Sequence, residues 1–170
     1  MNKTTQDDDI LAGIIIGGLF GGLVGASLAL PKLSEQDELQ QYRVAQQQLL
    51  IRKQRIGNLS ILYKLRQRPA LFNLFVESFN MFIYGFFRGS SVFSIAVIEN
   101  LLKEKYNKEN FKMLIDNAKA DKLINEKEEY YLNGLRLDRN DLVHNASCEI
   151  SENESLMIIH LAMRIVNEIL

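Results

Sequence analysis

An uncharged apolar run over residues 10–30 constrains the fold of this 170-residue chain more than any other feature. A helix of that length, at about 1.5 Å per residue, spans the roughly 30 Å hydrocarbon core of a bilayer. A cleaved signal peptide is the main alternative. Its basic opening segment is replaced here by Asp7, Asp8 and Asp9, and the run exceeds the usual length of about 7 to 15 residues. We therefore predict an uncleaved transmembrane helix over 10–30, preceded by a polar tail over 1–9.

Within this run, glycine recurs at every fourth position. The four residues in this register are Gly13, Gly17, Gly21 and Gly25. They line one helix face with positions that lack a side chain, which lets a second backbone approach closely where lipid removes the hydrophobic drive for association. Because the spacing is regular, we expect this glycine zipper to mediate self-association, with another membrane protein as the alternative partner.

Basic residues are concentrated after the apolar run. Lys3 is the only one before it, whereas residues 32–68 carry eight Lys and Arg against three acidic residues. An excess of Lys and Arg marks the cytoplasmic flank of a membrane helix. We therefore predict a single-pass membrane protein with its C-terminal domain in the cytoplasm. Cys148 is the only cysteine, which excludes an intrachain disulfide and agrees with a reducing compartment.

A polar, Gln-rich segment without proline follows over 34–58. Its apolar residues fall at spacings of three and seven, which predicts a helical connector over 31–58. Polar residues interrupt the second apolar stripe, so the pattern falls short of the roughly three or four clean heptads typical of a coiled coil. We expect the basic residues of this helix to face solvent, with contact to anionic lipid as the alternative.

Residues 59–170 have the apolar periodicity of a helical domain. Pro69 fits the first turn of a helix, and the run that follows over 71–87 is apolar enough to suggest a second membrane span. Glu77 argues against a span, because a carboxylate at the centre of a bilayer is costly. We therefore predict that 71–87 forms a buried core helix.

Apolar stripes at spacings of three and four predict four more helices, over 92–106, 111–124, 125–143 and 151–170. Residues 89–91 (GSS) are expected to break the chain before the first of these, and residues 151–154 have the pattern of a capping box. No segment alternates with a period of two for long enough to form a strand. The predicted fold is all-α, with a five-helix bundle over 59–170 behind the transmembrane helix and the connector.

The sequence RNDLVH at residues 139–144 gathers groups that suit RNA cleavage without a metal. In a helix, Asn140 and His144 share a face, and Arg139 lies about 100° from Asn140. A neutral imidazole can take the proton of an RNA 2′-hydroxyl that attacks its own phosphate, while a guanidinium holds the phosphate oxygens. The pattern therefore suits a metal-free RNA-cleaving site, with Arg139, Asn140 and His144 along one edge of a pocket and no cofactor expected.

Other observations favour a purely structural interpretation of this motif. Asp141 beside Arg139 allows a salt-bridged helix end. Residues 69–170 carry eleven Lys and Arg against fifteen acidic residues, whereas nucleic-acid-binding domains usually present a basic face. An Arg shortly before a His also arises by chance. The other histidine, His160, has no such Arg and is expected to be a packing residue of the final helix.

With this motif inside a helical domain, the region 71–170 resembles the HEPN superfamily, the small all-α domains named after higher eukaryotic and prokaryotic nucleotide-binding proteins. The helix that follows residues 87–89 (FRG) also looks like those of members found in bacterial defence and restriction-associated proteins. Glu99 on this helix stands where those relatives often have an acidic residue.

The resemblance implies that two copies dimerise, so that both motifs meet in one cleft and RNA is cut without a metal. By resemblance, Arg139 binds phosphate, His144 is the general acid and base, and Asn140 orients it. Glu99 is carried over as a supporting partner of Arg139. Many relatives have lost activity and serve as interaction modules, so the resemblance also admits a non-catalytic protein.

Two classes of function follow from these expectations. The first is a homodimeric or higher homo-oligomeric endoribonuclease of stress or phage defence, which acts on RNA at the membrane and has a neutralising or complex partner protein. The second is a non-catalytic HEPN-like or helical scaffold that assembles a membrane complex. A third alternative is a subunit that stabilises a membrane complex and has no HEPN ancestry. Zipper association would raise the local concentration of tethered domains to about the mM range and favour the dimer.

Overall fold

The computed structural model describes residues 35–108, 110–145 and 149–170, without the side chains at 35, 37, 38 and 137–144. Every regular element in these ranges is a helix, and the same ranges contain no strand. In chain order, the elements are α2 (Glu35–Ile56), the 3-10 helix η1 (Leu59–Leu65), α3 (Pro69–Ile83), α4 (Phe87–Tyr106), α5 (Phe111–Ala120), α6 (Glu126–His144) and α7 (Glu152–Ile169). The prediction of an all-α fold is confirmed for this part of the chain.

The predicted transmembrane helix over 10–30, its glycine zipper and the tail over 1–9 lie outside the described residues. Within the described ranges, no helix is both long enough and apolar enough to cross a membrane. The chain divides into two compact units, residues 1–42 and 43–170. The second unit contains the helical bundle together with the C-terminal half of α2.

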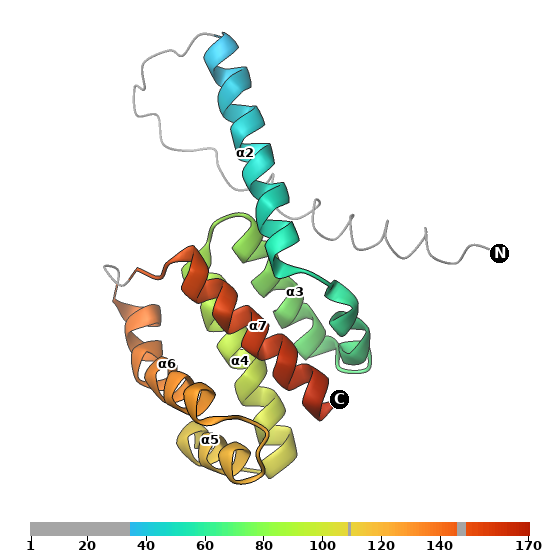
Figure 1. The fold of residues 1–170 in the computed structure, drawn as a ribbon, viewed down its shortest axis with the longest axis vertical. Coiled ribbons are helices and arrows are strands. Elements are labelled where there is room, and N and C mark those ends of the chain that lie inside the picture. The colour runs from blue at the N-terminus through green and yellow to red at the C-terminus, as the bar shows by residue number, and fades with distance from the viewer. Residues whose placement is uncertain (1–34, 109, 146–148) are drawn as a thin grey trace, which may run out of the picture. The chain divides into compact units, whose positions relative to one another are not determined.

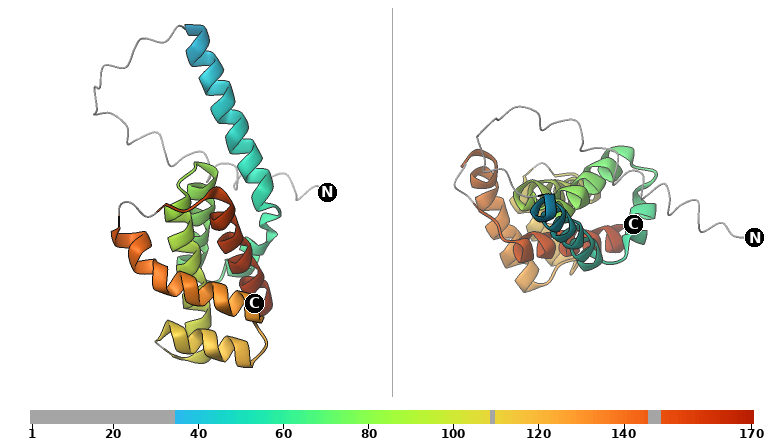
Figure 2. Two further views of the ribbon diagram at one scale, coloured as in Figure 1. Left: turned by 60° about the vertical axis from the view of Figure 1, so that its left-hand side comes forward. Right: turned by 90° about the horizontal axis from the view of Figure 1, so that it is seen from above.

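Helix α4 is the centre of the second unit, because it packs against α3, α5, α6 and α7. Figures 1 and 2 show α5 at the C-terminal end of α4, with α3 and α7 alongside it. The side chains of Ile95, Ile98, Leu101 and Leu102 on α4 are completely enclosed. Burial of an aliphatic side chain contributes about 1.5–3 kcal/mol, so this central helix holds the bundle together.

Helix α3 is a core helix, as its sequence predicts, and not a membrane span. It has 15 residues, of which Phe75 and Phe82 are fully buried, while Glu77 is exposed. Pro69 occupies the first turn, where its missing N–H leaves no intrahelical hydrogen bond unmade. The helix begins two residues before the predicted range over 71–87 and ends at Ile83.

The break between α3 and α4 falls at residues 84–86, so the prediction of a break at 89–91 is wrong. Gly85 turns the chain with a φ of 85°, a region that glycine adopts without steric cost. Gly89 lies inside α4, where an added Cβ would stand 2.6 Å from the sulfur of Met81. Glycine at 89 therefore serves close packing between the two helices.

The serines of the mispredicted break lie inside α4, and the hydroxyl groups of both have partners, with Ser90 Oγ 3.3 Å from Ser78 Oγ. Ser78 on α3 donates to the Ser90 carbonyl at 2.9 Å, and its Oγ lies 2.6 Å from the Ser94 Oγ. Ser91 donates to the Phe87 carbonyl at 2.8 Å. Paired hydroxyls avoid the cost of burying a lone polar group, so these small residues let α3 and α4 pack closely.

The predicted capping box of the final helix is confirmed. Ser151 Oγ accepts from the Glu154 backbone N–H at 3.2 Å, and the Glu154 carboxylate accepts from the Ser151 N–H at 2.9 Å. The Asn125 side chain accepts from the Glu128 N–H at the start of α6, and Glu128 returns the bond. Local capping chemistry therefore sets where α6 and α7 begin.

The helix predicted for the connector is present as α2. Its exposed apolar side chains are Leu39, Tyr42, Val44, Leu50 and Ile51. At the end of α2, Ile56 is only 2% exposed, and η1 then buries Ile61, Leu62 and Leu65. The packed core therefore starts at the last turn of α2, before the predicted start at residue 59.

Candidate functional site

The RNDLVH motif forms the last six residues of α6. Residues 139–144 thus have the helical backbone that the sequence argument requires, with positions 140 and 144 one turn apart. The side chains of Arg139, Asn140 and His144 lie outside the described residues, and the roles assigned to them stay predictions.

Glu99 stands on α4, the helix against which α6 packs. Its carboxylate lies 3.1 Å from the ammonium of Lys103, one turn further along α4, and the residue is 9% exposed. A carboxylate this deeply buried requires a cation or hydrogen-bond donors beside it. Lys103 supplies one cation, while the predicted pairing of Glu99 with Arg139 falls outside the described residues.

Arg136 adds a guanidinium to α6 one turn before the motif. Its Nε is buried and has no hydrogen-bond partner among the residues that the structure describes. A buried donor of this kind costs about 1–3 kcal/mol unless an acceptor reaches it. Sequence reasoning overlooked Arg136, although it stands three residues before Arg139, about one turn away along α6.

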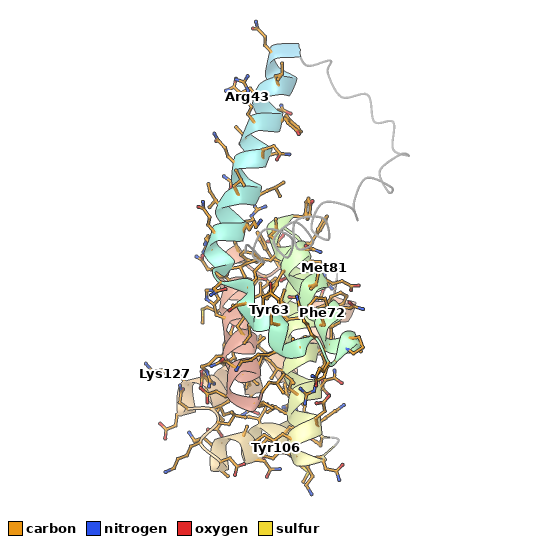
Figure 3. The ribbon with its side chains drawn as sticks, turned by 90° about the vertical axis from the view of Figure 1, so that its right-hand side faces the viewer. Arg43, Tyr63, Phe72, Met81, Tyr106 and Lys127 are labelled. Atoms are coloured by element: carbon orange, nitrogen blue, oxygen red, sulfur yellow. The ribbon has the colours of Figure 1, made fainter. Side chains whose placement is uncertain are left out.

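An open groove of about 670 Å³ lies at the α3–α4 turn. Its apolar lining is formed by Met81, Phe86, Phe87, Val92, Phe93 and Ile150. Arg88 and Glu149 are the charged residues of the lining. Figure 3 shows Met81, which marks this groove, and Tyr106 at opposite ends of the bundle. The groove therefore sits at the end of the bundle where α3 passes into α4.

The groove is close to the motif along the chain. Glu149 follows His144 by five residues, and an extended chain of that length reaches no more than about 18 Å. The Cα atoms at 144 and 149 are therefore within that distance of each other. No signal in the sequence pointed to this groove, because its lining combines residues 81–93 with residues 149–150, which are far apart in the chain.

Arg52 of α2 fixes the helix ends beside the groove. Its Nε donates to Glu152 Oε2 at 3.1 Å, and its Nη1 donates to the Ile83 carbonyl at 3.3 Å. The guanidinium also lies 5.1 Å from the ring centroid of Phe87, within cation–π range. One side chain thus joins the end of α2 to the end of α3 and to the first residues of α4 and α7.

Two further contacts hold the end of α2. Arg55 binds the Glu152 carboxylate and donates to Asn153 Oδ1 at 2.6 Å. The Nε2 of His160 lies 3.3 Å from the Ile56 carbonyl oxygen, at the last residue of α2. His160 is exposed, so its predicted role as a packing residue is wrong. It faces the end of a second helix, which a reading of α7 alone does not reveal.

Within the residues that the structure describes, no three His, Cys, Asp or Glu side chains gather to hold a metal ion. Comparisons of the chain with known protein families, with curated proteins and with solved structures gave no match.

A second pocket of about 350 Å³ lies between α6 and α7, and its lining includes Lys127, Glu128, Tyr131, Met157, His160, Leu161 and Arg164. Arg164 is engaged there, since its Nε donates to Glu128 at 2.8 Å and its Nη1 to the Leu123 carbonyl at 2.9 Å. Burial, and then the charge of Glu154, raise the pKa of Tyr131 to about 12. The phenol is neutral near pH 7, and these contacts dock α7 onto α6.

Proposed function

We propose that this chain is a membrane-anchored, HEPN-like protein that acts as a metal-independent endoribonuclease in stress or phage defence. The observation that supports it is the position of RNDLVH in the last turns of α6, a helix packed against α4 with its buried Glu99. Arg and His on neighbouring positions of one helix end combine a phosphate binder with a proton acceptor. The described helices are consistent with the all-α part of this proposal.

The proposed reaction uses the chemistry of RNA itself. His144 takes the proton of a 2′-hydroxyl, whose oxygen attacks the adjacent phosphorus as the bond to the 5′-oxygen breaks. The partner subunit's His144, in its protonated form, gives a proton to the departing 5′-oxygen. Arg139 binds the non-bridging oxygens, where negative charge develops. The products are a 2′,3′-cyclic phosphate and a 5′-hydroxyl.

The remaining predicted site residues support Arg139 and His144. Asn140 orients the base, and Glu99 holds Arg139 in place. In the proposed assembly two copies meet so that both motifs share one cleft. The glycine zipper over 10–30 keeps the copies together on the cytoplasmic face of a membrane, which raises the effective concentration of the tethered domains to about the mM range.

Expression of variants in cells tests this function. Wild-type chain should arrest growth and increase RNA turnover, whereas Arg139→Ala and His144→Ala should do neither. His160→Ala is the matched control, since it removes the other histidine from an exposed position. Identical growth and RNA turnover for all four chains would show that the catalytic proposal is wrong.

The alternative is a non-catalytic scaffold that assembles a membrane complex. The observation that favours it is the set of exposed apolar side chains on the part of α2 that belongs to the second unit, namely Val44, Leu50 and Ile51. A partner protein that covers them would gain apolar burial. Recovery of one stoichiometric membrane partner with both wild type and His144→Ala, and unchanged function in the variant, would support the scaffold over the enzyme.

A further inference from the structure

We propose that the groove at the α3–α4 turn binds one unpaired base of an RNA strand and prefers guanine. This inference rests on the proposed ribonuclease function and names the substrate that it selects. The substrate is single-stranded RNA with an unpaired guanine close to the scissile phosphate.

The wall of the groove suits stacking. Phe86 lines it and is 58% exposed, which is unusual for so large an apolar ring. Its neighbour Phe87 is held by the Phe82 ring, with centroids 5.5 Å apart, and by the guanidinium of Arg52. One aromatic residue is therefore open to solvent beside another that is fixed in place. Unstacked RNA bases bind to proteins on aromatic faces of this kind.

Glu149 supplies a group that can read the edge of the base. It is exposed and lies on the lining of the groove. An ionised carboxylate is purely an acceptor and offers two oxygens side by side. Guanine presents two adjacent donors on its Watson–Crick edge, the N1–H and the N2 amino group, and so matches both oxygens. Adenine has an acceptor at N1, which faces the carboxylate unfavourably.

The size and position of the groove fit a nucleotide. Its volume of about 670 Å³ lies within the range of small-molecule sites, about 300–1,000 Å³, and it is open to solvent. The limit of about 18 Å between residues 144 and 149 lets one strand place a base in the groove and a phosphate at the motif. Base binding would thereby position the cut.

Binding of short, labelled single-stranded RNA to the full chain in mild detergent tests this inference. All variants carry His144→Ala so that RNA stays intact, and the RNAs differ only in one central base, guanine or adenine, within a run of uridines. We expect Phe86→Ala to weaken binding of the guanine RNA by roughly tenfold, as loss of one stacked base does. Tyr130→Ala, which removes an aromatic residue that is 84% exposed and outside the groove lining, should leave binding unchanged.

Glu149→Gln gives an independent arm with almost no change in side-chain shape. The preference for guanine over adenine should fall by roughly tenfold, because the amide loses one of the two acceptors. Binding that ignores the central base, or equal effects of Phe86→Ala and Tyr130→Ala, would overturn the base site and leave the proposed function standing. If the His144→Ala chain binds no RNA at all, both proposals fail together. Should Phe86→Ala not fold, the Glu149→Gln comparison decides.

Discussion

Arg52 and Glu152 form a hydrogen-bonded ion pair of 3.1 Å between residues that are 100 positions apart in the chain. Both side chains are largely enclosed, at 19% and 25% exposure. Glu152 is the first residue of α7, where a negative charge is also favoured by the helix dipole. The pair therefore joins the last turns of α2 to the first residue of α7.

We predict that Arg52 and Glu152 are energetically coupled. In a double-mutant cycle with alanine, urea unfolding should give a coupling free energy of about 1–3 kcal/mol, because both side chains are largely enclosed and solvent weakens their attraction less. The control is the Arg68–Glu104 pair, which has a similar distance of 2.9 Å but is 39% and 47% exposed. Its coupling should stay below about 1 kcal/mol. Equal coupling in the two pairs would contradict the role given to Arg52.

Replacement of two glycines by alanine should have opposite effects on stability. At Gly85, φ is 85° and an added Cβ would lie 3.1 Å from Arg52 Nη1, so Gly85→Ala should lower the free energy of unfolding by about 1–2 kcal/mol. Gly134 lies inside α6, where an added Cβ would have no tertiary neighbour within 4 Å among the described side chains, so Gly134→Ala should raise the free energy of unfolding by about 0.5–1 kcal/mol. Thermal melts of both variants check the sign. A stabilising Gly85→Ala would mean that the turn does not require this conformation.

Helix starts were predictable from the sequence where short-range chemistry decides them. Pro69 and the Ser151 capping box act within four residues of where they stand, and both occur as expected. The break expected at Gly89 failed for the opposite reason. Its environment is decided by Met81 on another helix, and glycine was needed there for space rather than for a turn.

The same distinction between short-range and long-range signals applies to the candidate site. The RNDLVH pattern is readable from the chain because its residues are adjacent, and α6 does extend to His144. No local pattern in the sequence marks Arg52, Phe86 or Glu149. Phe86 and Glu149 line one groove, and Arg52 binds Glu152, only because distant segments pack together in the fold. Long-range charge pairs and grooves of this kind depend on the packed fold, which no periodicity encodes.

Two partly buried tyrosines should make the protein sensitive to alkali. Burial raises the pKa of Tyr106, with further effect from Asp121, and that of Tyr131, with further effect from Glu154, in both cases from 10.0 to about 12. The folded state therefore holds both protons more tightly than the unfolded chain does. The stability that these two side chains contribute is fully present below about pH 10 and is lost as the pH rises toward about 12.

Denaturation at a series of alkaline pH values checks this behaviour. Tyr106→Phe and Tyr131→Phe should each flatten the loss of unfolding free energy between about pH 10 and 12, because a phenyl ring cannot ionise. Tyr130→Phe, at an exposed position, is the matched control and should follow the wild-type curve. If all three variants follow the wild-type curve, neither the Tyr106 nor the Tyr131 phenol contributes.

The glycine zipper should control association of the full chain. Gly17→Leu with Gly21→Leu places bulky side chains on the proposed contact face, so sedimentation in detergent should show a shift from dimer or higher oligomer toward monomer. Ala12→Leu adds the same side chain on the opposite side of the predicted helix and should leave the oligomer intact. Equal effects of the two changes would remove the link between the zipper and the shared site.

Cleavage of RNA by purified full chain in the presence of a metal chelator is the decisive test of the proposed metal-independent reaction. We predict products that end in a 2′,3′-cyclic phosphate and a 5′-hydroxyl, identified by mass spectrometry. We also predict that His144→Ala lowers the rate by a factor on the order of 10²–10⁴, the usual contribution of general acid–base catalysis, while His160→Ala retains it. Undiminished cleavage by His144→Ala, or no cleavage by wild-type dimer, would contradict the account.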